Sequence, residues 1–213
     1  MTTKPELAQP KSQPSASRQR RERERQQMRA RLLEAARDIA AEEGWNAVTI
    51  RRIANKLEYT PPILYQYFSS KESLFVELML VGFSELTDRL TTAAEAPAQQ
   101  RLAALAEAYW AFAFASPELY QAMNGMDGVP FGTADTPPEA KTAFRTFRIA
   151  LQSVAEARGA ELSDPGGAVD TVWAFLHGCV SLAMAGRVKG GSERARALML
   201  NAVEPLFAAQ LSH

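Results

Sequence analysis

The sequence has 213 residues, 46% hydrophobic and 23% charged, a balance ordinary for a soluble globular protein of one medium or two small domains. Its single cysteine excludes an internal disulfide and its two histidines leave little for metal or nucleophilic chemistry, so we expect a cytoplasmic protein without metal or cofactor. Residues 1–71 hold 14 Lys and Arg against 8 Asp and Glu, whereas residues 72–213 hold 10 against 16, so only the N-terminal part is expected to meet a polyanion.

The N-terminal segment is polar and contains prolines, and we expect residues 1–26 to form a disordered basic arm. It lacks the apolar run of a secretory signal. Seven arginines, between Arg18 and Arg31, suit the phosphates or a narrow minor groove of DNA, and the alternative is a solubilising tail. The first helix is expected to begin near Arg18 or Met28 and to stop at Gly44.

Two short helices are expected next, over residues 50–57 and 61–68. Thr49 is a plausible N-cap for the first, and Thr60 followed by Pro61 is a cap plus a proline at the first helical position of the second. Only the turn residues Glu58 and Tyr59 separate the first helix from the cap Thr60, and apolar side chains on both helices can share a small core. This spacing is typical of a helix-turn-helix, whose second helix enters the major groove of DNA.

A capping box is expected at Ser69, with Glu72 three residues later, opening a long helix that ends near Thr92. Lys71 falls in its first turn, where a cation opposes the positive end of the helix dipole at a cost of about 0.3–1 kcal/mol unless an anion docks there. The helix N-terminus together with Lys71 therefore predicts a phosphate site. The alternative is a solvent-exposed lysine without a role.

A specific pattern runs from the first of these helices into the long one. It consists of Thr49, Ile53-Ala54, the run Leu64-Tyr65-Gln66-Tyr67-Phe68, Ser69-Ser70, Lys71 and Leu74. The pattern resembles that of the TetR/AcrR family of transcriptional regulators, and the resemblance implies a TetR-type DNA-binding domain over residues 27–87 with its motif at 49–68. It implies phosphate contacts by Thr49, Thr60, Tyr65, Tyr67 and Lys71, and base contacts by Pro61, Pro62, Ile63 and Gln66.

Two positions depart from that family. Glu58 stands in the turn where a glycine is usual, and Pro61-Pro62 stand early in the recognition helix where a small residue is usual. Pro62 also removes a backbone donor. Few polar groups are left to read bases, so Gln66 against adenine and Ile63 against thymine methyls predict an A/T-containing half-site.

Apolar residues recur at helical spacing through the rest of the chain, and β-type alternation is nearly absent. We therefore expect an all-α fold of about nine helices, with a three-helix DNA-binding domain and a helical ligand-binding and dimerisation domain over residues 88–213. The Gly-rich stretch Asn124 to Asp135 is expected to be a mobile flap beside a cavity. Start signals for the later helices stand near Pro97, Ser116, Thr136, Asp164 and Ser192.

Bulky apolar side chains are numerous enough in the C-terminal part to line a cavity between helices. Residues 171–188 resemble the WHG-type C-terminal domain of some TetR-family regulators, at Trp173, His177 and Gly178. Trp173 and His177 share a helix face and are expected to bracket a ligand; the alternative is plain core, with His177 a satisfied core histidine. The candidate ligand-binding residues are Met79, Phe83, Trp110, Phe114, Met123, Phe144, Phe147, Trp173 and His177.

Small residues recur along the helix near position 178 at spacings of four, three and four, which lets another helix approach closely. The 16 uncharged residues 171–186 are too few for an ordinary membrane span, so a buried helix is expected. One side of it is expected to face the domain core, and another side to face the same helix of a second subunit. The resemblance to the TetR/AcrR family implies that the two subunits form a four-helix bundle there. The candidate interface residues are Ala174, Gly178, Ser181, Ala185, Leu198, Ala202 and Leu206.

Together these expectations describe a repressor, a homodimer that binds palindromic operator DNA and leaves it when a small, largely apolar ligand binds. The alternative is an activator or a ligand-independent DNA-binding protein. An enzyme is disfavoured, because Cys179 is off the helix face of His177 and no carboxylate is spaced to orient the histidine. A membrane-surface role is disfavoured, because Arg18 to Glu24 lacks an apolar face.

Overall fold

The structure, a computed structural model, describes residues 16–124 and 132–212 and is almost entirely helical there. The all-α prediction is confirmed, with nine α-helices and one short 3-10 helix, Trp45–Ala47, in these residues. The helices are α1 (Ala16–Glu43), α2 (Ile50–Lys56), α3 (Pro61–Leu64), α4 (Lys71–Ala94), α5 (Ala98–Ala115), α6 (Pro117–Asn124), α7 (Pro138–Ala157), α8 (Pro165–Met184) and α9 (Gly191–Ala208).

The described residues also contain two strands that the sequence did not predict. Glu161–Leu162 (β1) and Leu211–Ser212 (β2) pair in antiparallel fashion and join the α7–α8 connection to the end of the chain. Two residues per strand are too few to show an alternating pattern, so periodicity gave no signal. Most of the predicted flap, residues 125–131, and residues 1–15 of the predicted arm lie outside the described residues.

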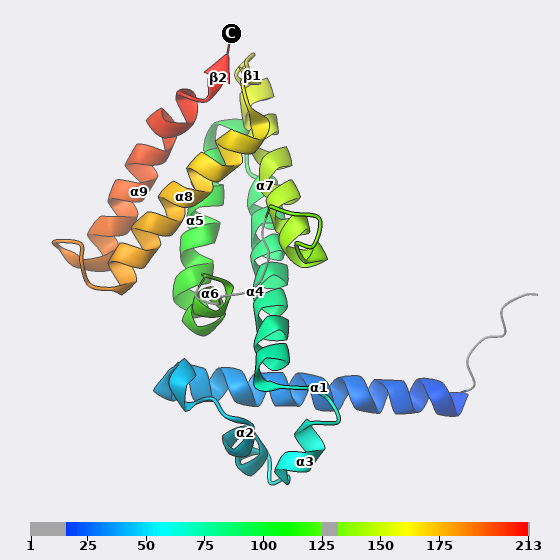
Figure 1. Ribbon diagram of the computed structural model, residues 1–213. Helices are drawn as coiled ribbons and strands as arrows, with labels where there is room; N and C mark the ends of the chain where they lie inside the picture. Colours follow the sequence, from blue (N-terminus) through cyan, green and yellow to red (C-terminus); the bar gives the residue numbers. More distant parts are fainter. Residues whose placement is uncertain (1–15, 125–131, 213) are drawn as a thin grey trace, which may run out of the picture.

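Helix α1 lies across the molecule and separates two groups of helices (Figure 1). On one side lie α2 and α3, and from the other side α4 runs into the bundle formed with α5 to α9. Buried side chains on both sides, such as Leu32, Ile53 and Leu86, belong to one continuous apolar cluster. The helix-turn-helix is therefore a small unit at one end, and α1 and α4 join it to the bundle.

The first helix begins earlier than the predicted boundary of the arm. Residues 16–26 are helical, although the sequence led us to expect disorder up to residue 26. Two pairs at i,i+4 spacing stabilise these turns: Arg20 Nε donates to Glu24 at 2.9 Å, and Gln26 donates to Glu22 at 3.1 Å. The helical part of the arm is thus longer than charge repulsion and the helix dipole suggested.

The N-cap of α4 differs by one residue from the predicted one. Ser70, not Ser69, is the N-cap: its hydroxyl accepts from Ser73 N at 3.2 Å, and Ser73 Oγ accepts from Ser70 N at 3.1 Å. A serine hydroxyl thus takes the place that the predicted box gave to Glu72. Lys71 becomes the first residue of the helix.

Helix α8 is, within the described residues, the one helix long and apolar enough to cross a membrane by length and composition alone. A core helix of a soluble protein passes the same test, so this is weak evidence for a membrane protein. The helix packs against α5, α7 and α9 and buries Val172, Leu176 and Val180. Asp164 caps its start, accepting a hydrogen bond from Gly166 N at 3.0 Å, where the sequence predicts a helix start.

Candidate DNA-binding and effector sites

The turn between α2 and α3 forms without the glycine that is usual there. Glu58 adopts φ of 59°, in the left-handed region that glycine favours, at a cost of about 1 kcal/mol for a residue with a β-carbon. Tyr59 N donates to Ala54 O at 2.8 Å and closes the turn. The helix-turn-helix expected from the spacing therefore has the two helices and the short turn that define it.

Helix α3 is shorter than predicted. It ends at Leu64 rather than Phe68, and residues 65–67 form a turn whose amides at Gln66 and Tyr67 donate to the last two helical carbonyls at 3.1 and 2.9 Å. Ser70, the N-cap of α4, is extended, with φ of −156°, so α3 and α4 are separate helices. The candidate recognition segment is therefore one helical turn followed by a tight turn.

The four residues predicted to contact bases lie at the surface of this segment. Pro62 and Gln66 are exposed, and Pro61 and Ile63 are half-buried. Leu64 between them is fully buried and fixes the segment to the domain core. The spacing therefore brings these candidate side chains together in one partly exposed segment, as the sequence predicts.

Four of the five residues predicted to contact phosphates differ in how they are held. Thr49 Oγ1 accepts from Arg52 N at 3.2 Å and caps α2, as predicted. Thr60 is exposed and its side chain makes no cap hydrogen bond. Tyr65 is 57% exposed, whereas Tyr67 is half-buried and packs against the apolar cluster. Thr49, Thr60 and Tyr65 are thus exposed, and Tyr67 is the least accessible of the four.

Lys71, the fifth, is half-buried at the start of α4. Its ammonium lies 4.9 Å from the centroid of the Phe75 ring, four residues along the same helix, in a cation–π contact. The contact holds the positive charge beside the helix N-terminus, where backbone amides also point outward. This combination suits an anion such as a phosphate.

Cations on α2 are engaged with acidic side chains of α1. Arg52 forms an ion pair with Glu43, and the hydrogen bond that Arg52 donates to Glu43 lowers the pKa of the Glu43 carboxyl. Lys56 Nζ lies 3.1 Å from Asp38 Oδ2. These pairs hold α2 against α1.

A cavity of about 570 Å³ lies between α4, α6, α7 and α8, a size suited to a small molecule. Four of the nine predicted ligand-binding residues line it: Phe83, Met123, Phe144 and Trp173. The polar lining was not predicted from the sequence. Asn124 ends α6, and Thr133 and Thr136 lie in a loop, where periodicity does not fix side-chain direction, whereas Lys141 and Asp170 lie three residues before Phe144 and Trp173 on the same helices. These missed residues are Asn124, Thr133, Thr136, Lys141 and Asp170, with Gly132 and Ala140 beside them.

Four other predicted ligand-binding residues do not line this cavity. Met79 and Phe147 are fully buried, and Phe147 meets the Trp173 ring edge-on at a centroid distance of 5.8 Å. Trp110 and Phe114 stack on each other at 4.5 Å, and Phe114 is 39% exposed. The plain-core alternative accounts for the burial of Met79 and Phe147, and a ligand role for all four stays a prediction.

His177 lies outside the cavity lining and has partners for both ring nitrogens. Tyr120 Oη is 2.6 Å from Nδ1, and Ser181 Oγ is 3.2 Å from Nε2. Burial lowers the pKa of His177, which favours the neutral ring with one donor and one acceptor nitrogen. The alternative named from sequence, a satisfied core histidine, accounts for this geometry.

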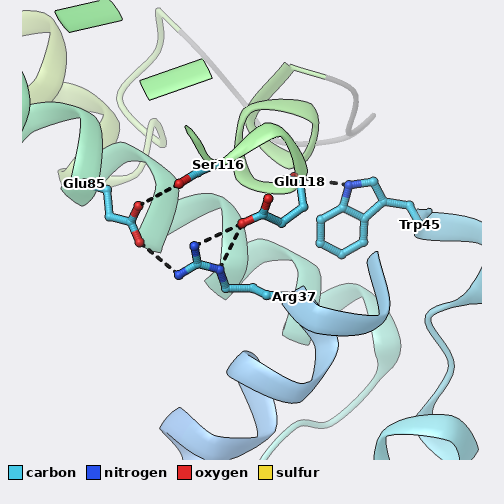
Figure 2. A network of polar contacts seen from close by, with 5 residues as sticks. All are labelled: Arg37, Trp45, Glu85, Ser116 and Glu118. Carbon is cyan, nitrogen blue, oxygen red and sulfur yellow. Dashed lines mark hydrogen bonds and ion pairs between the residues drawn. The ribbon is translucent and has the colours of Figure 1, made fainter. Parts of the chain in front are cut away.

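A polar network that was not predicted from the sequence joins α1 to the bundle, and Figure 2 shows its five residues. Arg37 on α1 donates to Glu118 on α6 at 3.0 and 3.1 Å and to Glu85 on α4 at 2.9 Å. Ser116 donates to Glu85 at 3.3 Å, and Trp45 Nε1 donates to the Glu118 carbonyl at 3.2 Å. One helix, α6, thus contributes both to this network and to the cavity.

Glu118 is the buried charged member of that network, at 7% exposure. A carboxylate in the first turn of a helix is favoured by the helix dipole, so its sequence position has an ordinary local explanation. The contact with Arg37 spans 81 residues, and no local pattern signals a contact of that separation. The network could therefore be found only once the helices were packed.

The predicted dimer-interface residues lie along α8 and α9. Ala174, Ala185 and Leu198 are exposed, and Leu198 reaches 46%. Leu182, which lies on α8 between Ala174 and Ala185, is 48% exposed. A β-carbon added at Gly178 would meet nothing within 4 Å. The remaining candidates, Ser181, Ala202 and Leu206, are half-buried.

Catalytic or metal chemistry has little basis in the described part of the chain. No group of three His, Cys, Asp or Glu residues able to hold a metal ion occurs there. Cys179 is half-buried, and burial raises the pKa of its thiol, which disfavours the reactive thiolate.

Two family models match the chain. Residues 32–78 match the model described as bacterial regulatory proteins, tetR family, and residues 102–206 match that of the Tetracyclin repressor-like C-terminal domain. A curated relative, the uncharacterized HTH-type transcriptional regulator YobS of Bacillus subtilis, is 30% identical over 92 residues. That alignment covers 43% of this chain and 48% of the relative, so the chain spans about half the length of that protein.

Solved structures match over most of the chain. A protein of unknown function from Rhodococcus sp. RHA1 has a TM-score of 0.72 and 23% identity, covering 86% of this chain and 95% of its own. The transcriptional regulator FadR from Bacillus subtilis, solved in complex with stearoyl-CoA, has a TM-score of 0.62 and 16% identity, covering 84% and 97%. At these identities the two likenesses show the fold.

Proposed function

The chain belongs to the TetR family of bacterial regulatory proteins, and we propose that it is a homodimeric repressor that leaves its palindromic operator when a small, largely apolar molecule binds. The family consists of DNA-binding transcriptional regulators, not enzymes. One observation carries the proposal: α6 supplies Met123 to the cavity and Glu118 to the link with α1. Effector binding and DNA binding are therefore connected through one helix, α6.

DNA binding is assigned to residues 27–87, within which the match to the N-terminal family model falls. The exposure of Tyr65, Thr60 and Gln66 supports contacts by this surface. Phosphate contacts position such a domain and base contacts give it specificity. The proposed phosphate contacts are Thr49, Thr60, Tyr65, Tyr67 and Lys71, and the proposed base contacts are Pro61, Pro62, Ile63 and Gln66.

The effector is assigned to the cavity in residues 88–213. Phe83, Phe144 and Trp173 offer aromatic surface to an apolar body, and Lys141 and Asp170 offer charge to a polar end. The same fold holds stearoyl-CoA in FadR, which shows that it can accommodate a long apolar chain in that protein. We therefore propose a largely apolar effector with one polar end.

Dimerisation is assigned to the exposed side of α8 and α9. Only 33% of the apolar part of α8 is buried within the chain. Leu182 on α8 and Leu198 on α9 are exposed. Apolar surface of this kind is typical of a protein–protein interface. The open space at Gly178 would let the same helix of a second copy approach closely.

The mechanism follows from the position of α6. Glu118 is five residues before Met123, so a displacement at the cavity is transmitted along about 7.5 Å of helix to the Arg37 contact. Hydrogen bonds of 2.9–3.1 Å weaken steeply when their geometry changes, so a small shift of α6 loosens α1. Two recognition segments must sit about 34 Å apart to enter successive major grooves, and reorientation of α1 changes that separation.

The proposal is tested by selecting DNA and effector separately. Wild-type protein should enrich a palindrome from randomised duplexes, and a lipophilic compound that raises its melting temperature should release it from that palindrome. Trp173→Ala should weaken binding of the compound at least about tenfold without changing affinity for the palindrome, as loss of an aromatic contact predicts. Ile149→Ala, an exposed site on α7, is the matched control.

Failure has distinct forms. If wild-type protein enriches no palindrome, it is not a sequence-specific DNA-binding protein. If the compound strengthens DNA binding, or transcription from the palindrome rises when the protein is present, the activator alternative is correct. Because its partner is DNA, we propose that the protein acts in the cytoplasm.

A further inference from the structure

The N-terminal part of α1 projects beyond the rest of the molecule (Figure 1). Residues 16–27, which we call the α1 spur, are exposed throughout, whereas α1 buries residues from Leu32 onward. The spur holds five arginines and two glutamates. It is therefore a basic helix with no other part of the described chain packed against it.

The spur arginines are arranged unevenly around the helix. Arg18 and Arg25 are seven residues apart, and the same step leads on to Leu32 and Ile39, which are buried in the core. Seven residues make almost two turns, with a drift of only about 20°. Arg21 lies between Arg18 and Arg25 on the same face. These three arginines, the spur stripe, thus continue the buried face of α1 beyond the edge of the domain.

Arg29 shows where this face points. Its guanidinium donates to Glu77 on α4 at 2.6 Å and lies 5.1 Å from the centroid of the Phe68 ring. Phe68 is the buried residue that closes the recognition segment. Arg25, one turn before Arg29, is on the same side of the helix. The spur stripe therefore runs outward from the end of the helix-turn-helix motif.

Within the described residues, the three guanidinium groups of the stripe form no ion pair, whereas Arg20 on another side of the spur pairs with Glu24 at 2.9 Å. Like charges at i,i+3 and i,i+4 spacing repel, and cations oppose the positive end of the helix dipole. The stripe thus concentrates positive charge that the chain itself does not neutralise. A polyanion on this face would relieve the repulsion.

We propose that the spur stripe binds the phosphates of DNA outside each half-site, an inference that rests on the proposed DNA-binding function. From Arg29 to Arg18 the helix advances about 16 Å, close to five base pairs of duplex at about 3.4 Å each. The spur points away from α8 and α9, the proposed dimer surface (Figure 1). In a dimer the two spurs therefore extend outward, and each lengthens the contact at one end of the palindrome.

The test compares two triple variants with the same change of charge. Arg18→Gln, Arg21→Gln and Arg25→Gln remove the stripe, and Arg20→Gln, Arg23→Gln and Arg31→Gln remove three arginines from the other sides of α1. Glutamine keeps the helix propensity of arginine, and circular dichroism compares the helix content of the two proteins. The probe is the palindrome that wild-type protein selects, made with no flanks and with ten base pairs added at each end.

Wild-type protein should bind the flanked duplex more tightly, with a salt slope steeper by about five for six phosphate contacts per dimer. The stripe variant should bind both duplexes alike, the control variant should keep most of the difference, and a stripe of three lysines should restore it. Equal losses in the two glutamine variants, or no effect of flanks on wild-type protein, would overturn the inference while leaving the proposed function intact. Failure of wild-type protein to select any palindrome would overturn both.

Discussion

Helix α6 is held at two places by polar clusters of opposite character. At its first turn the charged cluster joins Glu118 to Arg37 on α1, and Arg37 also binds Glu85 on α4. Two residues later, on the opposite face of the helix, the neutral cluster joins Tyr120 to His177 on α8 at 2.6 Å. One face of α6 thus depends on ionised groups of another unit of the fold, and the opposite face depends on neutral hydrogen bonds within the bundle.

The two clusters differ in how they respond to a displacement of α6. A buried carboxylate is costly to leave unpaired. Its contacts with an arginine also adapt poorly to displacement, because the guanidinium fork is rigid. The neutral cluster lies among aromatic rings, with Tyr120 stacked on His177 at 5.6 Å and edge-on to Tyr109 at 6.1 Å. Packing on that face keeps α6 against the bundle, so a displacement of α6 is expected to loosen the charged contacts first.

The largest effect is expected where the charged cluster is broken on one side only. Arg37→Ala leaves Glu118, 7% exposed, without its partner, and should lower the free energy of unfolding by about 3 kcal/mol, measured by urea denaturation. Arg37→Met combined with Glu118→Gln removes both charges and should restore most of the loss. If the single and double variants are equally unstable, the charged cluster does not hold this end of the helix.

A smaller loss of stability is expected when the neutral cluster is broken. Tyr120→Phe removes the hydroxyl that meets His177 Nδ1 and leaves a buried ring nitrogen unpaired, so the free energy of unfolding should fall by about 1–2 kcal/mol. Ser181→Ala is the milder control, because the bond from Ser181 Oγ to His177 is longer, at 3.2 Å. A loss at Ser181 as large as that at Tyr120 would contradict the ranking of the two contacts.

These two clusters also mark the limit of what the sequence could predict. The caps at Thr49 and Asp164 and the turn at Glu58 depend on neighbours within a few residues, so local pattern was enough to find them. The contact between Arg37 and Glu118 spans 81 residues and depends on how three helices pack. Likewise Trp173 could be assigned to a cavity from its aromatic character, but the lining by Thr133, which lies in a loop, could not.

The two clusters should also differ in their dependence on pH, because only the neutral cluster contains a histidine. Burial lowers the folded pKa of His177 below its ordinary value of 6.5, so the unfolded chain takes up this proton first as the pH falls. The stability is therefore complete above pH 6.5 and is lost as the pH falls through the folded value. Between pH 7.5 and 5.5 the melting temperature should fall more in wild-type protein than in His177→Gln, and equal falls would contradict the buried neutral state.

The smallest change in stability is expected where α4 approaches α6. A β-carbon at Gly82 would lie 2.6 Å from Met123 Sδ and 3.4 Å from Leu119 Cβ, so the flexible Met123 side chain must move toward the cavity. The gain of about 1 kcal/mol in helix propensity roughly offsets the crowding. Gly82→Ala should therefore change the free energy of unfolding by less than about 1 kcal/mol while weakening effector binding in calorimetry. Unchanged effector affinity would show that Met123 does not shape the site.

The coupling through α6 is tested most directly by measuring operator affinity with and without an effector in a variant that lacks both charges of the Arg37–Glu118 contact. The effector is the lipophilic compound found by thermal shift, and the readout is fluorescence anisotropy of the selected palindrome. Arg158→Met with Glu204→Gln, an ion pair of 2.8 Å between α7 and α9, is the matched control.

Wild-type and control proteins should lose at least about tenfold in operator affinity when the compound binds, a coupling of about 1.4 kcal/mol. The variant with Arg37→Met and Glu118→Gln should bind the compound as tightly as wild-type protein does but change its operator affinity by less than about twofold. Full release of DNA by this variant would contradict the account.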